Sequence, residues 1–446
     1  MLSETIIETC WSTIEKFTDL ESIISLSSTC RSLHSLIIDA ATHKVKVTHF
    51  QVCNLPKPDN DDILIPRDYT TAHLRIPHYT SQALSHVHFP SLIKLHIDFP
   101  LSRRRLGTTG VASLDYVEDV HSPFLILASQ LGASACNKLK SLYLNFNRLM
   151  QYEVGGPLES TYEIFGQNLS RCCNELEELH IVNTGMVRGY NVSMYSVGLT
   201  IALASILKRK KDKIRNFEYE VCGRPLKHRQ YGGYSKANRD LFGAVLQSTK
   251  LERLCIKCSP DHFRDFVRAV DAMERKATTS ICDLTLMGGI VHYPADIRLE
   301  VDRITISDSF ITQVCHMLDH FSQCRSLRRL RLGIPKECWR EPHTLDAVTN
   351  LLSYQQDLEA VLLNFLGFDD KEGKVLKCMS DILSRLALNG CNIFRLYCLK
   401  NVDEARLREL SDCMEDLGFA MFLRTDRDIT FINNVQAWRR NVSFLL

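Results

Sequence analysis

The sequence has almost no excess charge of either sign and no long hydrophobic run. Its 446 residues carry 54 basic and 52 acidic side chains, a formal net charge of +2, so no overall field favours nucleic acid or an anionic membrane. The longest nearly apolar stretch, 197–207, is shorter than the about 20 residues that span a bilayer, and the first residues lack the pattern of a secretory signal. We therefore expect a soluble protein of the cytoplasm or the nucleus that does not bind membranes.

Motifs for common catalytic and metal chemistry are also missing. The nearest phosphate-loop candidate, 367–374, has five residues between its glycines instead of four, and Val375 follows where Ser or Thr is needed. Cys255 and Cys258 have no second cysteine pair at zinc spacing, and the five histidines between residues 73 and 96 have no carboxylate or cysteine company. The sequence therefore predicts a non-enzymatic protein without catalytic residues, metal or cofactor.

Cysteine, by contrast, is abundant. The 17 cysteines are an odd number, are spread along the chain and lie mostly within apolar patterns, which indicates reduced, buried thiols. The chain is much longer than a typical domain of roughly 150 residues, and 45% of it is hydrophobic, so it can form several domains or one long modular array.

A short apolar triplet recurs along the chain. Its pattern is leucine, two residues, leucine, one residue, leucine, with other apolar residues sometimes substituting, at spacings of 30 to 47 residues. The nine instances are Leu92-Leu95-Ile97, Leu139-Leu142-Leu144, Leu176-Leu179-Ile181, Ile214-Phe217-Tyr219, Leu251-Leu254-Ile256, Ile281-Leu284-Leu286, Leu327-Leu330-Leu332, Leu358-Val361-Leu363 and Ile393-Leu396-Cys398.

Segments with helical periodicity lie between the triplets. They cover 163–172, 197–208, 239–247, 263–273, 310–321, 345–352, 375–388 and 405–417. Each triplet ends in residues two apart, which in a strand point to one face, so repeated strand and helix units predict a curved α/β solenoid of parallel strands over 41–446. The alternative is an ordinary α/β domain with leucine-rich buried strands.

These units resemble the leucine-rich repeat, whose consensus ends in Asn or Cys, as at Asn147, Cys222 and Asn401. The spacing is longer and less even than the family's usual 20 to 29 residues. The resemblance implies a degenerate horseshoe with its parallel strands on the concave face. It also implies that the side chains between the buried leucines bind a protein target. The expected target-binding residues are His96, Tyr143, His180, Glu218, Arg253, Thr285, Arg329, Arg331, Arg395 and Tyr397. Four arginines in the later strands would favour acidic ligands.

A different segment, 1–40, precedes the array and has helical spacing. Its second half carries Ile23, Ile24, Leu26, Cys30, Arg31 and Leu33 in the order of an F-box motif. It therefore resembles an F-box, a small all-α domain that binds a Skp-type adaptor. The first half lacks the proline with which that family usually opens. The residues that the resemblance assigns to adaptor binding are Leu2, Ile6, Ile7, Ile23, Ile24, Leu26, Cys30 and Leu33. A segment this short is near the limit for folding alone, so a helical cap on the solenoid is the alternative interpretation.

A stretch rich in cations, tyrosines and glycines, 222–234, follows a predicted strand. We expect a loop that could bind an acidic or phosphorylated peptide, or RNA, through Arg224, Lys227, Arg229, Tyr231 and Tyr234. A plain surface loop is the alternative, and nucleic acid is not the expected partner.

The two resemblances together imply the substrate-recognition subunit of a ubiquitin ligase of the Skp, cullin and F-box type. Its partners would be a Skp-type adaptor, a cullin reached through that adaptor, and a protein target. The alternative is a repeat scaffold unconnected to ubiquitin.

Overall fold

The computed structural model describes residues 49–52, 63–64, 71–75, 87–88, 93–98, 139–145, 174–183, 197–221, 228–273, 280–288, 307–370, 373–397, 402, 404–425 and 428–433. The expected adaptor-binding segment, the boundary at residue 41 and the helix expected over 163–172 lie outside the described residues. So do Asn147, Cys222 and Asn401.

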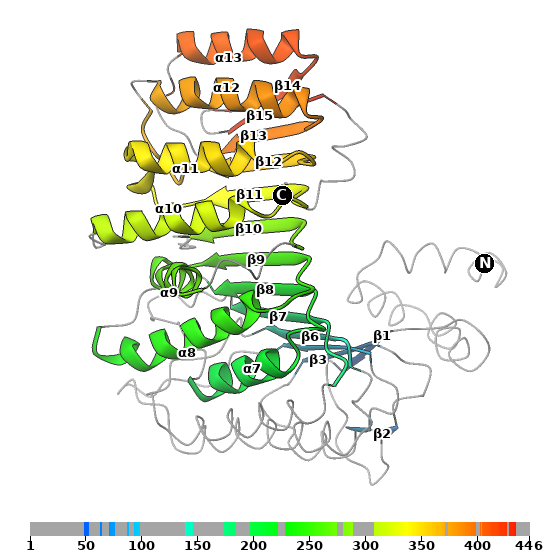
Figure 1. The fold of residues 1–446 in the computed structure, drawn as a ribbon. Coiled ribbons are helices and arrows are strands. Elements are labelled where there is room, and N and C mark those ends of the chain that lie inside the picture. The colour runs from blue at the N-terminus through cyan, green and yellow to red at the C-terminus, as the bar shows by residue number, and fades with distance from the viewer. Residues whose placement is uncertain are drawn as a thin grey trace, which may run out of the picture.

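Within the described residues, one sheet has thirteen strands, and a separate two-stranded sheet consists of β2 and β4 (Figure 1). The order in the large sheet is β1-β3-β5-β6-β7-β8-β9-β10-β11-β12-β13-β15-β14, and every pair from β1 to β13 is parallel. The strands are β1 (His49–Val52), β2 (Ile63–Leu64), β3 (Thr71–Arg75), β4 (Val87–His88), β5 (Lys94–Asp98), β6 (Ser141–Asn145), β7 (Glu178–Asn183), β8 (Asn216–Val221), β9 (Arg253–Cys258), β10 (Asp283–Gly288), β11 (Arg329–Gly333), β12 (Ala360–Asn364), β13 (Ile393–Tyr397), β14 (Ala420–Thr425) and β15 (Asp428–Ile432).

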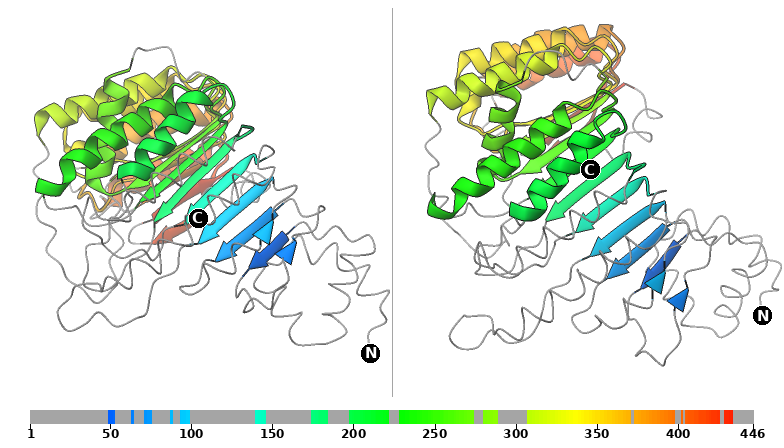
Figure 2. Two further views of the ribbon diagram at one scale, coloured as in Figure 1. Left: turned by 90° about the horizontal axis from the view of Figure 1, so that it is seen from below. Right: turned by 60° about the horizontal axis from the view of Figure 1, so that its bottom comes forward.

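The described helices all cover the same face of this sheet (Figures 1 and 2). They are α7 (Val197–Arg209), α8 (His228–Leu246), α9 (Pro260–Asp271), α10 (Asp308–Ser322), α11 (Pro342–Ser353), α12 (Lys374–Leu388), α13 (Glu404–Asp416) and the 3-10 helix η2 (Cys338–Arg340). A helix is about 10 Å wide, whereas neighbouring strands are about 4.8 Å apart. The wider helical layer therefore takes the outer side of a curve, and the sheet takes the inner side. The sheet face that carries no described helix is therefore the concave face.

The apolar triplets form the core, as expected. From Leu142 to Phe394, successive strands align the middle residue of one triplet with that of the next, and these side chains are buried. The backbone keeps this register between the strands as well, because the carbonyl of Arg215 accepts from the amides of Glu252 and Arg253 at 2.8 and 3.0 Å. Full burial of one such side chain stabilises the fold by about 1.5–3 kcal/mol. Because each repeat stacks on its neighbours, every repeat gains this stabilisation.

The last triplet corrects one expectation. Val361 pairs with Phe394 and Leu363 with Leu396, so the true triplet is Cys391-Phe394-Leu396 and not Ile393-Leu396-Cys398. A shift of two residues keeps the same side chains on the same face of a strand, so the apolar alternation alone could not exclude it. The shift moves Arg395 into the row occupied by Arg331 and Leu362, and Tyr397 into the next row.

An antiparallel hairpin ends the array. β15 lies between β13 and β14 and is antiparallel to both, and all five of its residues are buried. The triplet pattern did not predict this hairpin, since its strands follow one another without a helix between them.

The helices agree with the periodicity except at α8. α7 and α9 to α13 lie where apolar residues recur three or four apart. α8 begins at His228 and therefore includes Gly232 and Gly233, which the sequence analysis placed in a loop. Glycine in a helix interior costs roughly 1 kcal/mol relative to alanine, and the contacts of α8 with α7 and α9 offset that cost.

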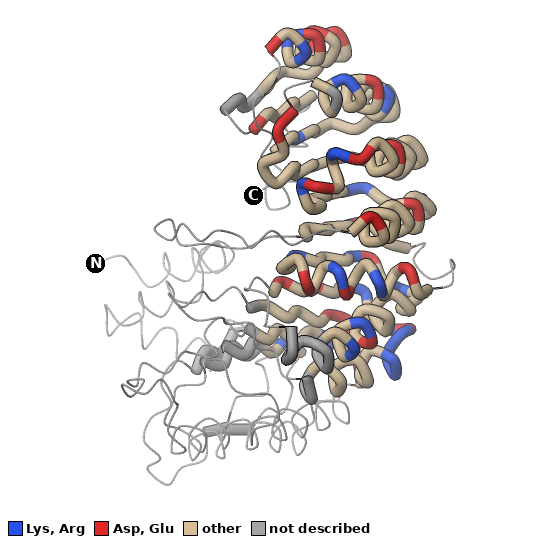
Figure 3. Tube along the Cα trace, turned by 90° about the vertical axis from the view of Figure 1, so that its left-hand side faces the viewer, with Lys and Arg blue, Asp and Glu red and all other residues tan. Residues whose placement is uncertain are grey.

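Basic and acidic residues are both spread along the helices of the covering layer (Figure 3). Nζ of Lys140 lies 3.0 Å from Oε1 of Glu177, and Nη1 of Arg215 lies 3.0 Å from Oε1 of Glu252. These ion pairs link successive repeats near the start of their strands. Solvent screens these partly exposed pairs, and they contribute little to stability. None of the described helices is long and apolar enough to cross a membrane.

Candidate functional site on the concave face

The parallel register places the outward-pointing residues of the strands in three continuous rows across the concave face. The first row is Lys94, Ser141, Glu178, Asn216, Arg253, Asp283, Arg329, Ala360 and Ile393. The middle row is His96, Tyr143, His180, Glu218, Cys255, Thr285, Arg331, Leu362 and Arg395. The third row is Asp98, Asn145, Val182, Glu220, Lys257, Met287, Gly333, Asn364 and Tyr397.

Every expected target-binding residue has its position in one of these rows. For His96, only the backbone is described. Register alone thus aligns residues of strands up to about 300 residues apart in the chain, as the parallel pairing of repeats requires. Whether these residues contact a target stays a prediction.

Within the middle row, side chains of β6, β7 and β8 contact one another in sequence. The rings of Tyr143 and His180 stack with their centroids 5.5 Å apart. Nδ1 of His180 lies 2.8 Å from Oε2 of Glu218, and the two side chains are each 17% exposed. The hydrogen bond with His180 lowers the pKa of Glu218, against the opposing effect of burial. Glu218 therefore stays a carboxylate at neutral pH, and the imidazole is held in one orientation.

Cys255 continues the row but does not have the properties of a nucleophile. Its Sγ lies 3.9 Å from Oε1 of Glu218. Burial, and then the negative charge of Glu218, raises the pKa of the thiol to about 12, so it stays protonated. Cys258 lies three residues further along the same strand and faces the opposite side of the sheet. The two thiols cannot bind one metal ion together.

Two of the four arginines in the later strands already have carboxylate partners. Arg329 donates to both oxygens of Asp283, through Nε at 2.5 Å and through Nη2. Arg395 donates to Asp428 of the terminal hairpin at 2.6 to 3.1 Å and lies over the ring of Tyr397 at 5.2 Å. Their charges are largely neutralised within the chain, which weakens the expected preference for acidic ligands.

The other two arginines differ in exposure. Arg253 is exposed and forms no ion pair with a described residue. Arg331 is half-buried, and burial lowers its pKa, with Arg395 and Arg253 adding to the effect as neighbouring positive charges. Of the four expected arginines, Arg253 is therefore the one best placed to meet an acidic group of a target.

The concave face is interrupted at β12. All five residues of this strand are buried, including the outward-facing Leu362, which is 4% exposed. Leu362 lies in register between Arg331 and Arg395. The accessible polar side chains therefore form one group on β6 to β11 and a second around β13.

The expected recognition loop is not a separate feature. Arg224 and Lys227 lie outside the described residues, whereas Arg229, Tyr231 and Tyr234 belong to the first turns of α8. The sequence analysis read the paired glycines as a loop signal, and the helix passes through them. The five residues therefore do not form a single loop.

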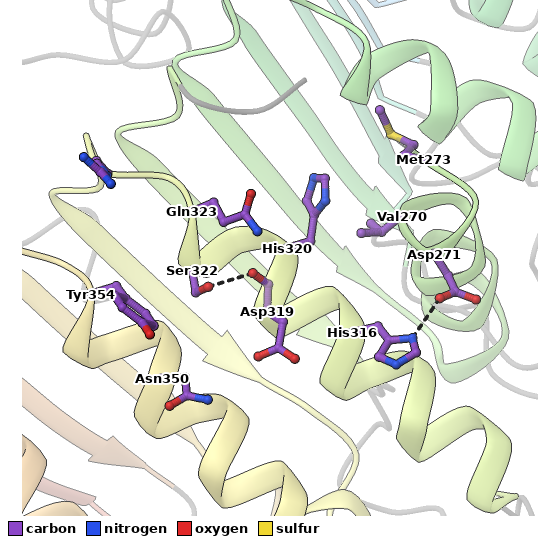
Figure 4. Close-up of a pocket in the computed structure, with 11 residues that line it drawn as sticks. Val270, Asp271, Met273, His316, Asp319, His320, Ser322, Gln323, Asn350 and Tyr354 are labelled. Atoms are coloured by element: carbon purple, nitrogen blue, oxygen red, sulfur yellow. Dashed lines mark hydrogen bonds and ion pairs between the residues drawn. The ribbon is translucent and has the colours of Figure 1, made fainter. Parts of the chain in front are cut away.

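The helical side of the protein has a recess that the sequence analysis did not predict. It has a volume of about 790 Å³ and lies among the C-terminal ends of α9, α10 and α11 (Figure 4). Asp271, His316, Asp319 and Tyr354 line it. These residues are polar or exposed positions of amphipathic helices, and no motif in the sequence marks them. Within the described residues, no three side chains of His, Cys, Asp or Glu are grouped so as to hold a metal ion.

The fold and the three rows define an α/β solenoid with an open strand face. No family model matches the chain, and no curated protein matches it. Among solved structures, it is similar to the crystal structure of the Rad7 and Elc1 complex in yeast, with 13% identity over 92% of this chain and 89% of that chain. The TM-score of this match is 0.35.

Proposed function

We propose that this chain is a protein-binding subunit that recognises its target with the concave face of the solenoid. The observation that supports this most directly is the in-register sheet, which presents aromatic, acidic and basic side chains in fixed rows. Such chemical variety suits a specific protein surface better than a uniform phosphate track. Catalysis is not part of the proposal, and no cofactor is required for it.

The finer proposal is that the chain is the substrate-recognition subunit of a ubiquitin ligase of the Skp, cullin and F-box type. It is supported by the F-box-like residues of the segment 1–40, directly ahead of the repeats. In this arrangement, the N-terminal segment binds the adaptor and the concave face holds the target. The chain then positions the target and leaves the chemistry to other subunits.

Co-purification with a Skp-type adaptor tests the finer proposal. We expect the intact chain to retain the adaptor and Ile24→Asp to lose it, because a charge at a matched apolar position prevents burial. Ser27→Asp adds the same charge at an unmatched position and should retain the adaptor. An intact chain that does not bind the adaptor, or equal losses in the two variants, would contradict the proposal.

The competing function is a repeat scaffold whose N-terminal segment only caps the solenoid. Deletion of residues 1–40 separates the two. A docking segment can be removed with the array still folded and adaptor binding lost, whereas loss of a cap exposes core and lowers the unfolding temperature of the array. Circular dichroism on heating, together with the adaptor assay, measures both outcomes.

A further inference from the structure

The recess on the helical side has an electrostatic character of its own. α9 ends at Asp271, α10 at Ser322 and α11 at Ser353, and all three ends lie around it. Each helix C-terminus carries about half a negative elementary charge. The carboxylates of Asp271 and Asp319 add to this field, and Arg325 is the only Lys or Arg among the lining residues. A cation is therefore favoured here over an anion.

The recess also offers an unusual amount of exposed aromatic surface. Tyr354, the C-cap residue of α11, is 64% exposed, although large apolar side chains of the described residues are mostly buried. Asp319 of α10 lies across from Tyr354 and Asn350 of α11 (Figure 4). An aromatic face next to a carboxylate suits a planar cation, which can stack on the ring and pair with the oxygens at the same time.

The opposite side of the recess is polar and partly pre-organised. Nδ1 of His316 lies 3.1 Å from Oδ1 of Asp271, and this pair joins α10 to α9. The side chains of the pair are 60% and 34% exposed, so solvent and a ligand can reach both. The amide of Gln323 also lines the recess and can accept or donate further hydrogen bonds.

We propose that this recess binds an arginine side chain presented by an extended segment of a partner protein. The guanidinium stacks on Tyr354 and pairs with Asp319, while the partner backbone lies along the ends of α9 and α10. Lysine fits less well, because its ammonium group has no planar face to stack and no paired donors for a carboxylate. This site is separate from the concave face and does not rest on the ubiquitin-ligase proposal.

Fluorescence anisotropy with the full chain tests the proposal. The probe is a short labelled peptide of glycine and serine that carries two arginines, and the matched probe has citrulline in their place, which keeps the shape and removes the charge. We expect the citrulline peptide, and the arginine peptide with either Asp319→Asn or Tyr354→Ala, to bind at least about tenfold more weakly. Asp346→Asn, an exposed residue of α11 outside the recess, is the control and should leave affinity unchanged.

Four results would overturn the proposal. Equal binding of the arginine and citrulline peptides would show that charge is not recognised. Unchanged affinity in both recess variants, with circular dichroism spectra like those of the parent chain, would place the peptide elsewhere. An equal loss in Asp346→Asn, or displacement by spermidine at the concentration at which the peptide binds, would reduce the effect to general attraction of cations.

Discussion

His262 of α9 is a polar side chain held within the core. It is 5% exposed, and its Nδ1 lies 3.3 Å from the hydroxyl of Tyr219 on β8. One turn further along the helix, Asp265 accepts from Ser235 at 2.5 Å and from Asn238 at 3.3 Å. Periodicity does not predict these hydrogen bonds, because a polar residue between apolar ones is typical of an exposed helix face. The bonds of Asp265 depend on the packing of α8 on α9.

Acid should unfold the chain partly through His262. Burial lowers the pKa of this histidine to about 4, below its ordinary value of 6.5. The unfolded chain therefore binds the proton more readily, and the stability contributed by the neutral imidazole is lost as the pH falls from 6.5 towards 4. We expect a loss of about 2 kcal/mol between pH 7 and pH 5.

Denaturant titrations at several pH values measure this loss. His262→Gln removes the titrating group, so its unfolding free energy should fall less over the same range. The pKa of Glu218 is also lowered, but its contribution disappears only below its ordinary value of 4.5. An equal pH dependence in the parent and His262→Gln would contradict the assignment.

Two glycines should respond in opposite ways to alanine. A Cβ on Gly288, at the end of β10, would lie 2.2 Å from the ring of Phe263, whereas a Cβ on Gly243 in α8 would meet no atom within 4 Å. We expect Gly288→Ala to destabilise the chain by about 1–3 kcal/mol through overpacking. Gly243→Ala should stabilise it by up to about 1 kcal/mol through helix propensity. Changes in unfolding free energy of the same sign in the two variants would contradict this account.

At the scale of strands and helices, the periodicity of apolar residues predicts most elements. The triplets from Leu139 to Leu363 identify their strands and their faces, because burial repeats every two residues in each strand. The same regularity permits the slip at β13, where a shift of two residues is invisible to the pattern. Ile393 and Cys398 are apolar, so the triplet Ile393-Leu396-Cys398 fits the pattern as well as the correct one does. The hairpin of β14 and β15 could not be predicted from a repeat that it does not follow.

A buried ion pair joins the hairpin to the last repeat, in addition to the pairing of β15 with β13. The side chain of Asp428 is 7% exposed, pairs with Arg395, and accepts from Oγ1 of Thr430 at 3.3 Å. Asp428→Asn leaves the guanidinium without this charge, and we expect a loss of about 3 kcal/mol. Hydrogen exchange should become faster in β14 and β15 before it does so in β9. Asp412→Asn, on the exposed side of α13, is the control and should change stability by less than about 0.5 kcal/mol.

For the whole molecule, the sequence predicts a parallel α/β array but not the antiparallel hairpin that follows its last parallel strand. The concave rows follow from repetition, whereas the neutralised arginines depend on which carboxylates the neighbouring strands supply. Asp283 and Asp428 lie 46 and 33 residues from the arginines with which they pair. Such distant pairs require the register to be known. The positions of the arginines in the repeat pattern predict a preference for acidic ligands, but they do not reveal these carboxylate partners.

Removal of the hairpin should damage the array more than its length suggests. A chain that ends before Ala420 loses the buried Phe431 and exposes the edge of β13, and an uncovered strand edge is a template for aggregation. We expect light scattering to rise on mild heating. A chain that ends after Asn433 keeps the hairpin and is the matched control. Equal solubility of the two chains would mean that the hairpin does not protect the array.

The position of β15 between β13 and β14 also restricts how such a protein can change in length over evolution. β15, the last strand of the described residues, is an inner strand of the sheet, so a unit added after it would have to cross β14 before it could find an open edge. Duplication or loss of a strand and helix between β6 and β13 meets no such obstacle. Lineages of this fold should therefore differ by insertions and deletions within the array, while the final hairpin is inherited unchanged.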